Sequence, residues 1–228
     1  MNISNYPSGF VGGVAIQGIP VLNTYSSKIF WVDSNGGGGS KGDFTHPCKT
    51  IAEAVALCTA SKGDVVLVKA GHTEAPVVTI TIDKIGVSVI GLGVGQNRPV
   101  ITPAHTIASD IAIEISAASV VLKNICLAAG TNTGGNTVQI NISANDVTIE
   151  DCSIEMGAKN LLGVTVTRNY DRFKILRCIF RGTAANPDCA IDLDSGSGDD
   201  TNYIISNCLF NFDGSAGLDE AGIRSSKI

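Results

Sequence analysis

The chain has 228 residues and a formal net charge of −5, with 16% charged and 44% hydrophobic side chains. The weak negative charge disfavours binding to nucleic acid or to an anionic membrane, and the chain is too hydrophobic to be intrinsically disordered. No apolar run is long enough to span a bilayer, and the N-terminus lacks the features of a signal peptide. With 26 glycines and 5% aromatic residues, the composition is typical of one β-rich domain.

The first predicted region, residues 1–44, is an N-terminal arm that ends in a glycine-rich loop. Residues 1–31 contain a single charged side chain, Lys28, and show neither helical nor strand periodicity. We expect an extended arm that lies against another surface, with a partly disordered terminus as the alternative. The loop Asn35–Gly42 lacks the residue order of a phosphate-binding loop. Residues 45–228 form the second region.

One helix is predicted, over Lys49–Ala60, with Thr45 and Pro47 at its start. Its apolar side consists of Ile51, Val55 and Cys58. The helix precedes the first strand of the buried type, Asp64–Val68. In that position it would cover the open end of a stack of strands and shield an unpaired edge. We therefore predict a capping helix.

The rest of the chain repeats one strand pattern, in which apolar residues alternate, skip two residues and alternate again. The matching members of the four copies are Ile125, Cys152, Cys178 and Cys208, at intervals of 27, 26 and 30 residues. Each copy also has an earlier strand, centred near Ile82, Ile115, Ile142, Val166 and Leu193. Strand-type alternation inside a period of this size predicts stacked β-coils. The predicted fold class is all-β, a single-stranded parallel β-helix.

The skipped residues are predicted to form bends, at Lys123-Asn124, Glu150-Asp151, Leu176-Arg177 and Ser206-Asn207. Asparagine at a bend can adopt left-handed backbone geometry. Stacking would also place Lys123 beside Glu150, and Asp151 beside Arg177, so that opposite charges lie on adjacent strands.

The seven cysteines include no CxxC pair and no histidine at metal-binding spacing. The repeat places Cys152, Cys178 and Cys208 in one inward column, with Cα atoms about 4.8 Å apart. Parallel Cβ directions do not suit a disulfide, so we expect reduced thiols that act as small core residues. This predicts maturation in a reducing compartment, with no metal and no cofactor.

Several segments resemble known proteins. Pro47–Val55, Gly63–Val68 and Gly71–Glu74 resemble the opening of the pectate-lyase-like, right-handed parallel β-helix superfamily: a capping helix, a Gly-Asp turn and the first coil strand. More narrowly, β-helix proteins of tailed bacteriophages are similar at Tyr6–Phe10, Gly18–Leu22, Phe30–Ser34, Gly91–Gly93 and Arg98-Pro99. The resemblance covers nearly the whole chain and supplies no catalytic motif. It implies a right-handed β-helix, a homotrimer, and a virion role as tailspike, fibre or capsid decoration protein.

Acidic residues are the candidates for catalysis. Hydrolysis of a polysaccharide needs two carboxyl groups about 5–9.5 Å apart. One outward column reads Thr81, Glu114, Asn141, Thr165 and Asp192. Its carboxyl groups lie three coils, or about 14 Å, apart, which is too far. Asp192 and Asp194, on one face at about 7 Å, form the best pair.

The acidic loop after that pair contains Asp200 and could bind calcium or assist hydrolysis, but we favour a solvated loop. We therefore predict no catalytic residue; if the protein is a polysaccharide lyase or glycoside hydrolase, Asp192, Asp194 and Asp200 are the candidates. The three histidines, His46, His72 and His105, are scattered over different turns. The arginines Arg168, Arg172 and Arg177 are expected to be surface or ladder charges.

An apolar strip on the outside of the later coils is the predicted protein interface, with scattered exposed aliphatic residues as the alternative. Its members are Cys126, Leu176, Ile179, Ile204 and Leu209. After Phe210 the sequence predicts one more strand, Gly222–Arg224, and no capping helix. The last edge would then be covered by a trimer mate, a longer parent chain or another virion protein.

These expectations favour a homotrimeric capsid decoration (cement) protein, made in the bacterial cytoplasm and located in the virion. Its partners would be the major capsid protein or another virion protein, with a host glycan as a further ligand. The alternative is a tailspike or fibre that binds or cleaves host-surface polysaccharide. A non-catalytic glycan-binding fibre is a third hypothesis, which the few aromatic residues disfavour.

Overall fold

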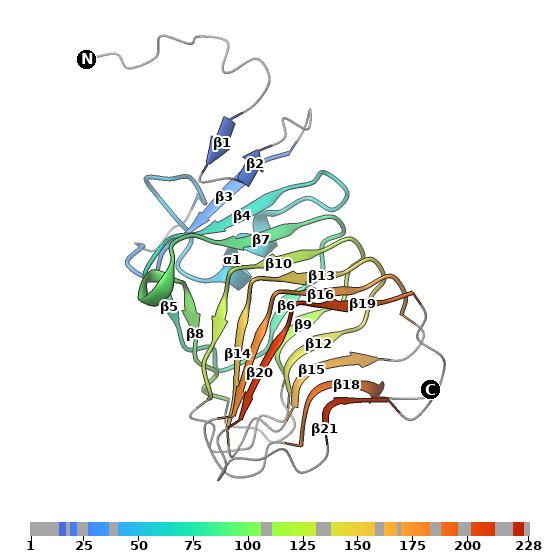
Figure 1. The fold of residues 1–228 in the computed structure, drawn as a ribbon. Coiled ribbons are helices and arrows are strands. Elements are labelled where there is room, and N and C mark those ends of the chain that lie inside the picture. Colours follow the sequence, from blue (N-terminus) through green and yellow to red (C-terminus); the bar gives the residue numbers. More distant parts are fainter. Residues whose placement is uncertain are drawn as a thin grey trace, which may run out of the picture.

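The computed structural model describes residues 14–16, 19–21, 27–36, 41–105, 111–130, 138–157, 162–167, 170–182, 188–195, 202–212 and 221–225. Their strands form a right-handed parallel β-helix in which successive coils stack and three sheets run along the stack (Figure 1). The prediction of an all-β parallel β-helix is therefore confirmed.

The chain passes through sheets 1, 2 and 3 in turn in each coil. Sheet 1 consists of β3 (Ile29–Val32), β4 (Val65–Val68), β7 (Ser88–Gly91), β10 (Val121–Lys123), β13 (Thr148–Glu150), β16 (Lys174–Leu176) and β19 (Ile204–Ser206). Sheet 2 consists of β5 (Thr73–Glu74), β8 (Val100–Ile101), β11 (Cys126–Leu127), β14 (Ser153–Met156), β17 (Ile179–Gly182) and β20 (Leu209–Phe212). Sheet 3 consists of β6 (Ile80–Ile82), β9 (Ile111–Ile115), β12 (Val138–Ile142), β15 (Leu162–Thr167), β18 (Cys189–Ser195) and β21 (Ala221–Arg224). A short 3-10 helix, η1 (Gly95–Asn97), precedes β8.

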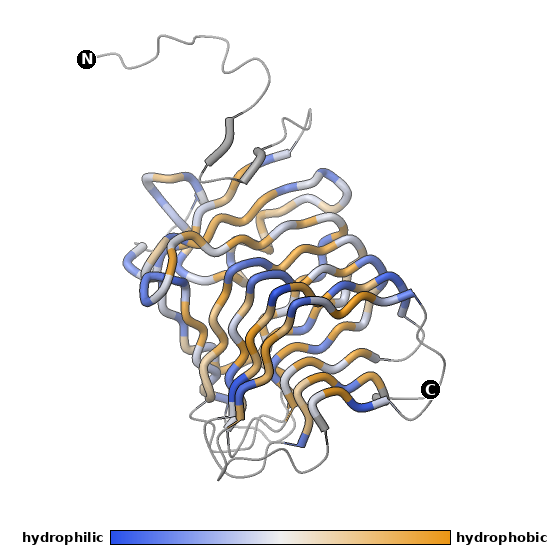
Figure 2. Tube along the Cα trace, viewed as in Figure 1, coloured by the Kyte–Doolittle hydropathy of each residue, from blue (hydrophilic) through white to orange (hydrophobic). Residues whose placement is uncertain are grey.

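The observed register confirms the repeat that the sequence predicted. In sheet 1, Leu122 lies opposite Ile149, which lies opposite Ile175, and the column continues to Ile205. Inward residues of the middle coils, such as Phe173 and Phe180, are fully buried. Figure 2 shows hydrophobic segments that recur at the same place in successive coils. A continuous apolar core therefore runs along the stack.

The bends between sheets 1 and 2 have the left-handed backbone geometry that was expected for asparagine. Asn124, Asp151, Arg177 and Asn207 all have φ between 52° and 57°. In this geometry the backbone N–H of Asn124, Asp151 and Arg177 donates to a carbonyl of the next coil, at 2.9–3.0 Å. Those hydrogen bonds offset the cost of about 1–2 kcal/mol that left-handed geometry carries for a residue with a side chain. A second series of bends, between sheets 3 and 1, has the same left-handed backbone geometry at Ser119, Asp146, Arg172 and Asn202.

The helix α1 (Ile51–Leu57) is shorter than the predicted Lys49–Ala60. It begins after the N-cap Thr50, whose hydroxyl accepts from the backbone N–H of Glu53, and not near Thr45 or Pro47. It ends because Cys58 has extended backbone geometry. The helix packs on β3, β4 and β6 through Ile51, Ala54 and Val55. That it closes the end of the core stays a prediction.

Strand β3 extends sheet 1 beyond β4, although it lies within the 1–44 region that was assigned to the arm. The coil stack therefore begins before residue 45. The backbone carbonyls and amides of β3 also bond to the segment 42–48. Within the same region, β1 (Val14–Ile16) and β2 (Ile19–Val21) form a two-stranded antiparallel sheet, where no strand was predicted. Residues 1–13, 17–18, 22–26 and 37–40 of this region lie outside the described residues.

The last described coil contains β19, β20 and β21, and the predicted strand at Gly222–Arg224 is confirmed as part of β21. Tyr203 stacks on Phe173, and Phe210 stacks on Phe180, in both cases with ring centroids 5.2 Å apart. The inward residues of this coil, including Ile205, Cys208 and Phe210, are only partly buried.

Candidate functional site

A column of polar side chains lies on the outer face of sheet 3. Its members follow the predicted register and continue by one more residue: Thr81, Glu114, Asn141, Thr165, Asp192 and Arg224. We call this set the polar column. Glu114 and Asp192 are separated by strands β12 and β15, so the expectation that they lie three coils apart is confirmed.

The polar column from Glu114 to Thr165 is a network of side-chain hydrogen bonds. The amide of Asn141 donates to Glu114 Oε2 at 2.8 Å, and its Oδ1 accepts from the Thr165 hydroxyl at 2.6 Å. Ser143 donates to the second oxygen of Glu114. Both oxygens of the Glu114 carboxylate are thus occupied, which disfavours Glu114 as a free acid or base.

Asp192 forms a two-point ion pair with Arg224, which the sequence analysis did not identify. Arg224 Nη2 and Nε lie 2.6 and 3.1 Å from the two carboxylate oxygens. The Asp192 side chain is 4% exposed and that of Arg224 is 31% exposed. The signal was present in the sequence, because matching Ile191 to Ile223 places Arg224 beside Asp192. In this fork Arg224 donates to both carboxylate oxygens of Asp192.

The proposed pairing of Asp192 with Asp194 assumed unbroken alternation along one strand. In the structure the register between β15 and β18 shifts, so that Thr165 lies opposite Asp192 but Thr167 lies opposite Ser195. The extra residue interrupts the two-residue step on which the predicted separation depended. The side chain of Asp194, and all of Asp200, lie outside the described residues.

The predicted interface residues lie on two sheets. Cys126, Ile179 and Leu209 share one outward column of sheet 2 with Val100, and we call these four residues the apolar column. The buried Ser153 occupies the position between Cys126 and Ile179. Leu176 and Ile204 lie on sheet 1, across the bend that contains Arg177 or Asn207. Leu209 is 56% exposed and Ile204 is 49% exposed.

Charged residues at the bends pair as the sequence predicted. Lys123 Nζ lies 3.2 Å from Glu150, and Arg177 Nε lies 2.8 Å from Asp151. Arg172 forms a fork with Asp146, and its guanidinium holds the pKa of that carboxyl below the ordinary value. The expectation that Arg172 and Arg177 are ladder charges is confirmed. Arg168 lies outside the described residues.

The histidines lie at separate places. His46 is exposed beside Asp43, and His105 is buried. His72 is also buried, and its Nε2 lies 3.2 Å from Glu74 Oε2. Sequence reasoning treated His72 as a turn residue, although the spacing of His72 and Glu74 along an extended strand could have indicated a shared face.

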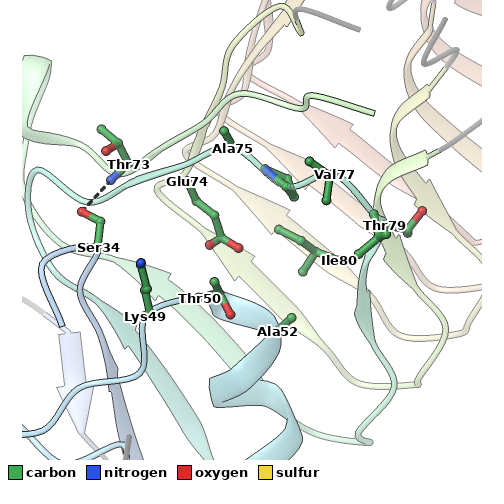
Figure 3. A pocket seen from close by; sticks show the side chains of 12 residues that line it. Ser34, Lys49, Thr50, Ala52, Thr73, Glu74, Ala75, Val77, Thr79 and Ile80 are labelled. Atoms are coloured by element: carbon green, nitrogen blue, oxygen red, sulfur yellow. Dashed lines mark hydrogen bonds between the residues drawn. The ribbon is translucent and has the colours of Figure 1, made fainter. Parts of the chain in front are cut away.

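Glu74 lines a pocket of about 450 Å³ between α1 and the segment that joins β5 to β6. Figure 3 shows its carboxylate in the middle of the pocket, between Thr50 and Ile80. Ala52, Val77 and Ile80 provide apolar walls, and Lys49 lies opposite them. This pocket was not predicted.

All seven cysteines lie among the described residues, and none of them forms a disulfide bond in the structure. Cys152 and Cys178 are fully buried, as expected for core residues. Burial raises the pKa of the Cys58 thiol to about 12 and also raises the pKa of Cys126. These thiols are therefore in the neutral form, which reacts slowly.

Within the described part of the chain, no cluster of three or more histidine, cysteine or acidic residues could hold a metal ion. The described helices include none that is long and apolar enough to cross a membrane.

No protein-family model matches the sequence, and no curated protein matches it significantly. Among solved structures, the chain is similar to pectate lyase Pel9A, with a TM-score of 0.60 and 16% identity over 89% of this chain and 56% of that one. It is also similar to a rhamnogalacturonan lyase, with a TM-score of 0.52 and 15% identity over 87% of this chain and 60% of that one. A protein of Geobacillus virus E2, ORF18, matches with a TM-score of 0.47 and 14% identity over 71% of this chain and 38% of that one.

The chain thus spans less than two thirds of the length of each of these structures. At such low identities the likeness concerns the coil architecture, and substrate-binding residues are not transferred. The chain shares the right-handed parallel β-helix fold of the pectate-lyase-like proteins.

Proposed function

We propose that this protein is a structural component of a bacteriophage virion, a homotrimeric capsid decoration protein that binds proteins and performs no chemistry. The observation that carries the proposal is the apolar column on the outer face of sheet 2. The phage origin depends on the sequence resemblance in the N-terminal segments and around Gly91–Pro99.

The apolar column is an unusual use of an outward face. Val100, Cys126 and Ile179 are half-buried, and Leu209 is the most exposed member. In a sheet with one face in water, inward apolar residues normally alternate with outward polar residues, and the polar column of sheet 3 follows this pattern. Because the column runs along sheet 2 over successive coils, a second copy can pack alongside it. A cyclic trimer would repeat this contact three times.

The polar column supports a non-catalytic role. Its carboxylates are held by other side chains, Glu114 by Asn141 and Ser143, and Asp192 by Arg224. A general acid or nucleophile needs a carboxyl group that can reach the substrate. Breaking the Arg224 fork to free Asp192 would leave a nearly buried charge unpaired, which is costly.

Sedimentation of the purified chain tests the assembly. We expect the wild type to sediment as a trimer and Leu209→Asp as a monomer, because a charge in an apolar contact is expensive to bury. Val94→Asp is the matched control, since Val94 is 81% exposed and lies outside the apolar column; it should leave the trimer intact. A monomeric wild type would count against the trimer, and antibody labelling of virions at the tail alone would count against capsid decoration.

The second candidate is a tailspike or fibre that binds or cleaves host-surface polysaccharide. It is favoured by the polar column, which offers a row of hydrogen-bonding groups along an outer sheet. The candidate catalytic residues are Asp192, Asp194 and Asp200. Release of reducing ends from a host-surface polysaccharide, abolished by Asp192→Asn, would support this function. Lack of release from the polysaccharides of every susceptible host would exclude cleavage, and lack of binding to them as well would exclude this candidate.

A further inference from the structure

The pocket between α1 and the β5–β6 connection contains a carboxylate oxygen that the protein leaves available. The Glu74 side chain is 8% exposed. Its Oε2 accepts from the backbone N–H of Ile51 at 3.1 Å and lies 3.2 Å from His72 Nε2. Among the described residues, no donor lies within hydrogen-bonding distance of Oε1, and Figure 3 shows the carboxylate directed into the pocket. An anionic oxygen that is open to a pocket can accept a hydrogen bond from a ligand.

His72 contacts the carboxylate of Glu74 through its Nε2. Its side chain is completely buried, and its Nδ1 has no hydrogen-bond partner among the described residues. Because a carboxylate oxygen only accepts, the contact between the two side chains has Nε2 of His72 as the donor. Together with the Ile51 amide, this donor fixes one oxygen of Glu74 and thereby orients the other toward the cavity.

The walls of the pocket suit an aliphatic chain. Ala52 and Ile80 flank the carboxylate, and Val77 and Val78 are 61% and 70% exposed beside it. A ligand that covers the apolar surface of these valines removes it from water, which favours binding. A volume of about 450 Å³ is within the ordinary range for small-molecule sites.

We propose that this pocket binds a primary ammonium group carried on a short aliphatic chain, either a free alkylamine or the side chain of a lysine in a peptide. The ammonium donates to Glu74 Oε1, and the methylene groups pack on Ala52, Val77 and Ile80. A carboxylate pairs with an ammonium more strongly than with a neutral donor. The proposal is independent of the virion role.

The positive charge of Lys49 should affect which ligands the pocket binds. Lys49 lies at the mouth of the pocket, is exposed, and forms no ion pair with any described residue. Its positive charge opposes an incoming ammonium, whereas it would attract a carboxylate ligand. Lys49→Ala should therefore strengthen binding of the amine at low salt and leave it unchanged at high salt.

The test uses the full chain and two matched probes, N-acetyl-lysine-methylamide and its norleucine isostere. Binding of each probe is measured by saturation-transfer NMR and by titration calorimetry. We expect saturable binding of the lysine probe and none of the norleucine probe. n-Butylamine should bind if the ammonium and chain suffice, and only the lysine probe should bind if peptide groups are also needed. Equal binding of lysine and norleucine probes, or binding of neither, would overturn the proposal.

Variants localise the effect. Glu74→Gln keeps an acceptor for Ile51 but removes the charge, and should weaken binding of the lysine probe at least tenfold, since a hydrogen bond between two charged groups is stronger than one to a neutral amide. Glu155→Gln, a carboxylate on the outer face of sheet 2, is the control and should have no effect. If Glu74→Gln fails to fold, Ala52→Phe fills the pocket from α1 without changing Glu74. Unchanged affinity in Ala52→Phe, or in a folded Glu74→Gln, contradicts the assignment.

Discussion

The two ends of the described stack consist of the same kind of coil but differ in how far their inward residues are buried. At the N-terminal end, α1 contacts β3, β4 and β6, and Phe30, Ile51 and Val55 are buried. At the C-terminal end, Ile205 and Phe210 occupy the same kind of inward position and stay partly exposed. In a repeat protein each coil contacts only its neighbours. The repeat therefore specifies which way a side chain points, and the neighbours decide how much it is buried.

The inward residues of the last described coil are only partly buried, so any surface that packs on them would bury more apolar area. The stacked pair Phe180 and Phe210 shows the point. Phe180 has coils on both sides, whereas Phe210 has its partner on one side only among the described residues. A protein surface that covered the last coil would supply the missing contacts of Phe210.

The largest expected effect comes from truncating those two rings. Phe180→Ala should lower the free energy of unfolding by about 3–5 kcal/mol, as for a fully buried phenylalanine. Phe210→Ala should cost about half as much, because part of its surface is already in water. Denaturant unfolding at low protein concentration measures both values. Equal costs would show that the ends of the stack do not differ in burial.

The same pair of variants can detect a partner. If copies of the chain cover the last coil, the cost of Phe210→Ala should rise with protein concentration, while that of Phe180→Ala should not. A concentration-independent ratio would mean that self-association leaves Phe210 as exposed as it is here.

The coil architecture was predictable because its signal is periodic. Ile125, Cys152, Cys178 and Cys208 repeat an inward position, and each strand needs only its own alternation to be recognised. The polar column followed from the same register. Its extension to Arg224 was also within reach, because Ile223 continues the apolar pattern.

Features that depend on single contacts between distant segments were not predictable. The pairing of β3 with β4 joins residues that are separated by a helix and a loop, and no repeat links them. The pocket at Glu74 requires α1 and the β5–β6 connection to meet at a particular distance. The bulge in β18 breaks an alternation that sequence reasoning had to assume. Local pattern gives direction, but contact distances come only from the assembled chain.

A smaller effect is expected at the N-terminal end of the described stack. Asp64 is completely buried, and its two oxygens accept from the backbone N–H groups of Lys28 at 2.6 Å and Thr59 at 2.7 Å. Asp64→Ala leaves both amides without an acceptor and should lower the free energy of unfolding by about 1.5–3 kcal/mol. Asp83→Ala is the control, because Asp83 is exposed and pairs with its neighbour Lys84, and should change stability by less than about 0.5 kcal/mol. Equal effects would mean that Asp64 does not tie β3 to the stack.

The smallest effect is a titration in the segment that bonds to β3. The hydroxyl of Thr45 and the backbone N–H of His46 lower the pKa of Asp43 to about 2. Because this folded-state pKa lies below the ordinary value of 3.8, the carboxylate stabilises the turn above about pH 4, and this contribution is lost as the pH falls toward 2. NMR titration of the Asp43 carboxyl should therefore give a midpoint near 2, and Thr45→Ala should move it upward. A midpoint of 3.8 in the wild type would show that the turn is not formed in solution. The segment 42–48 would then not be an ordered hydrogen-bonding partner of β3.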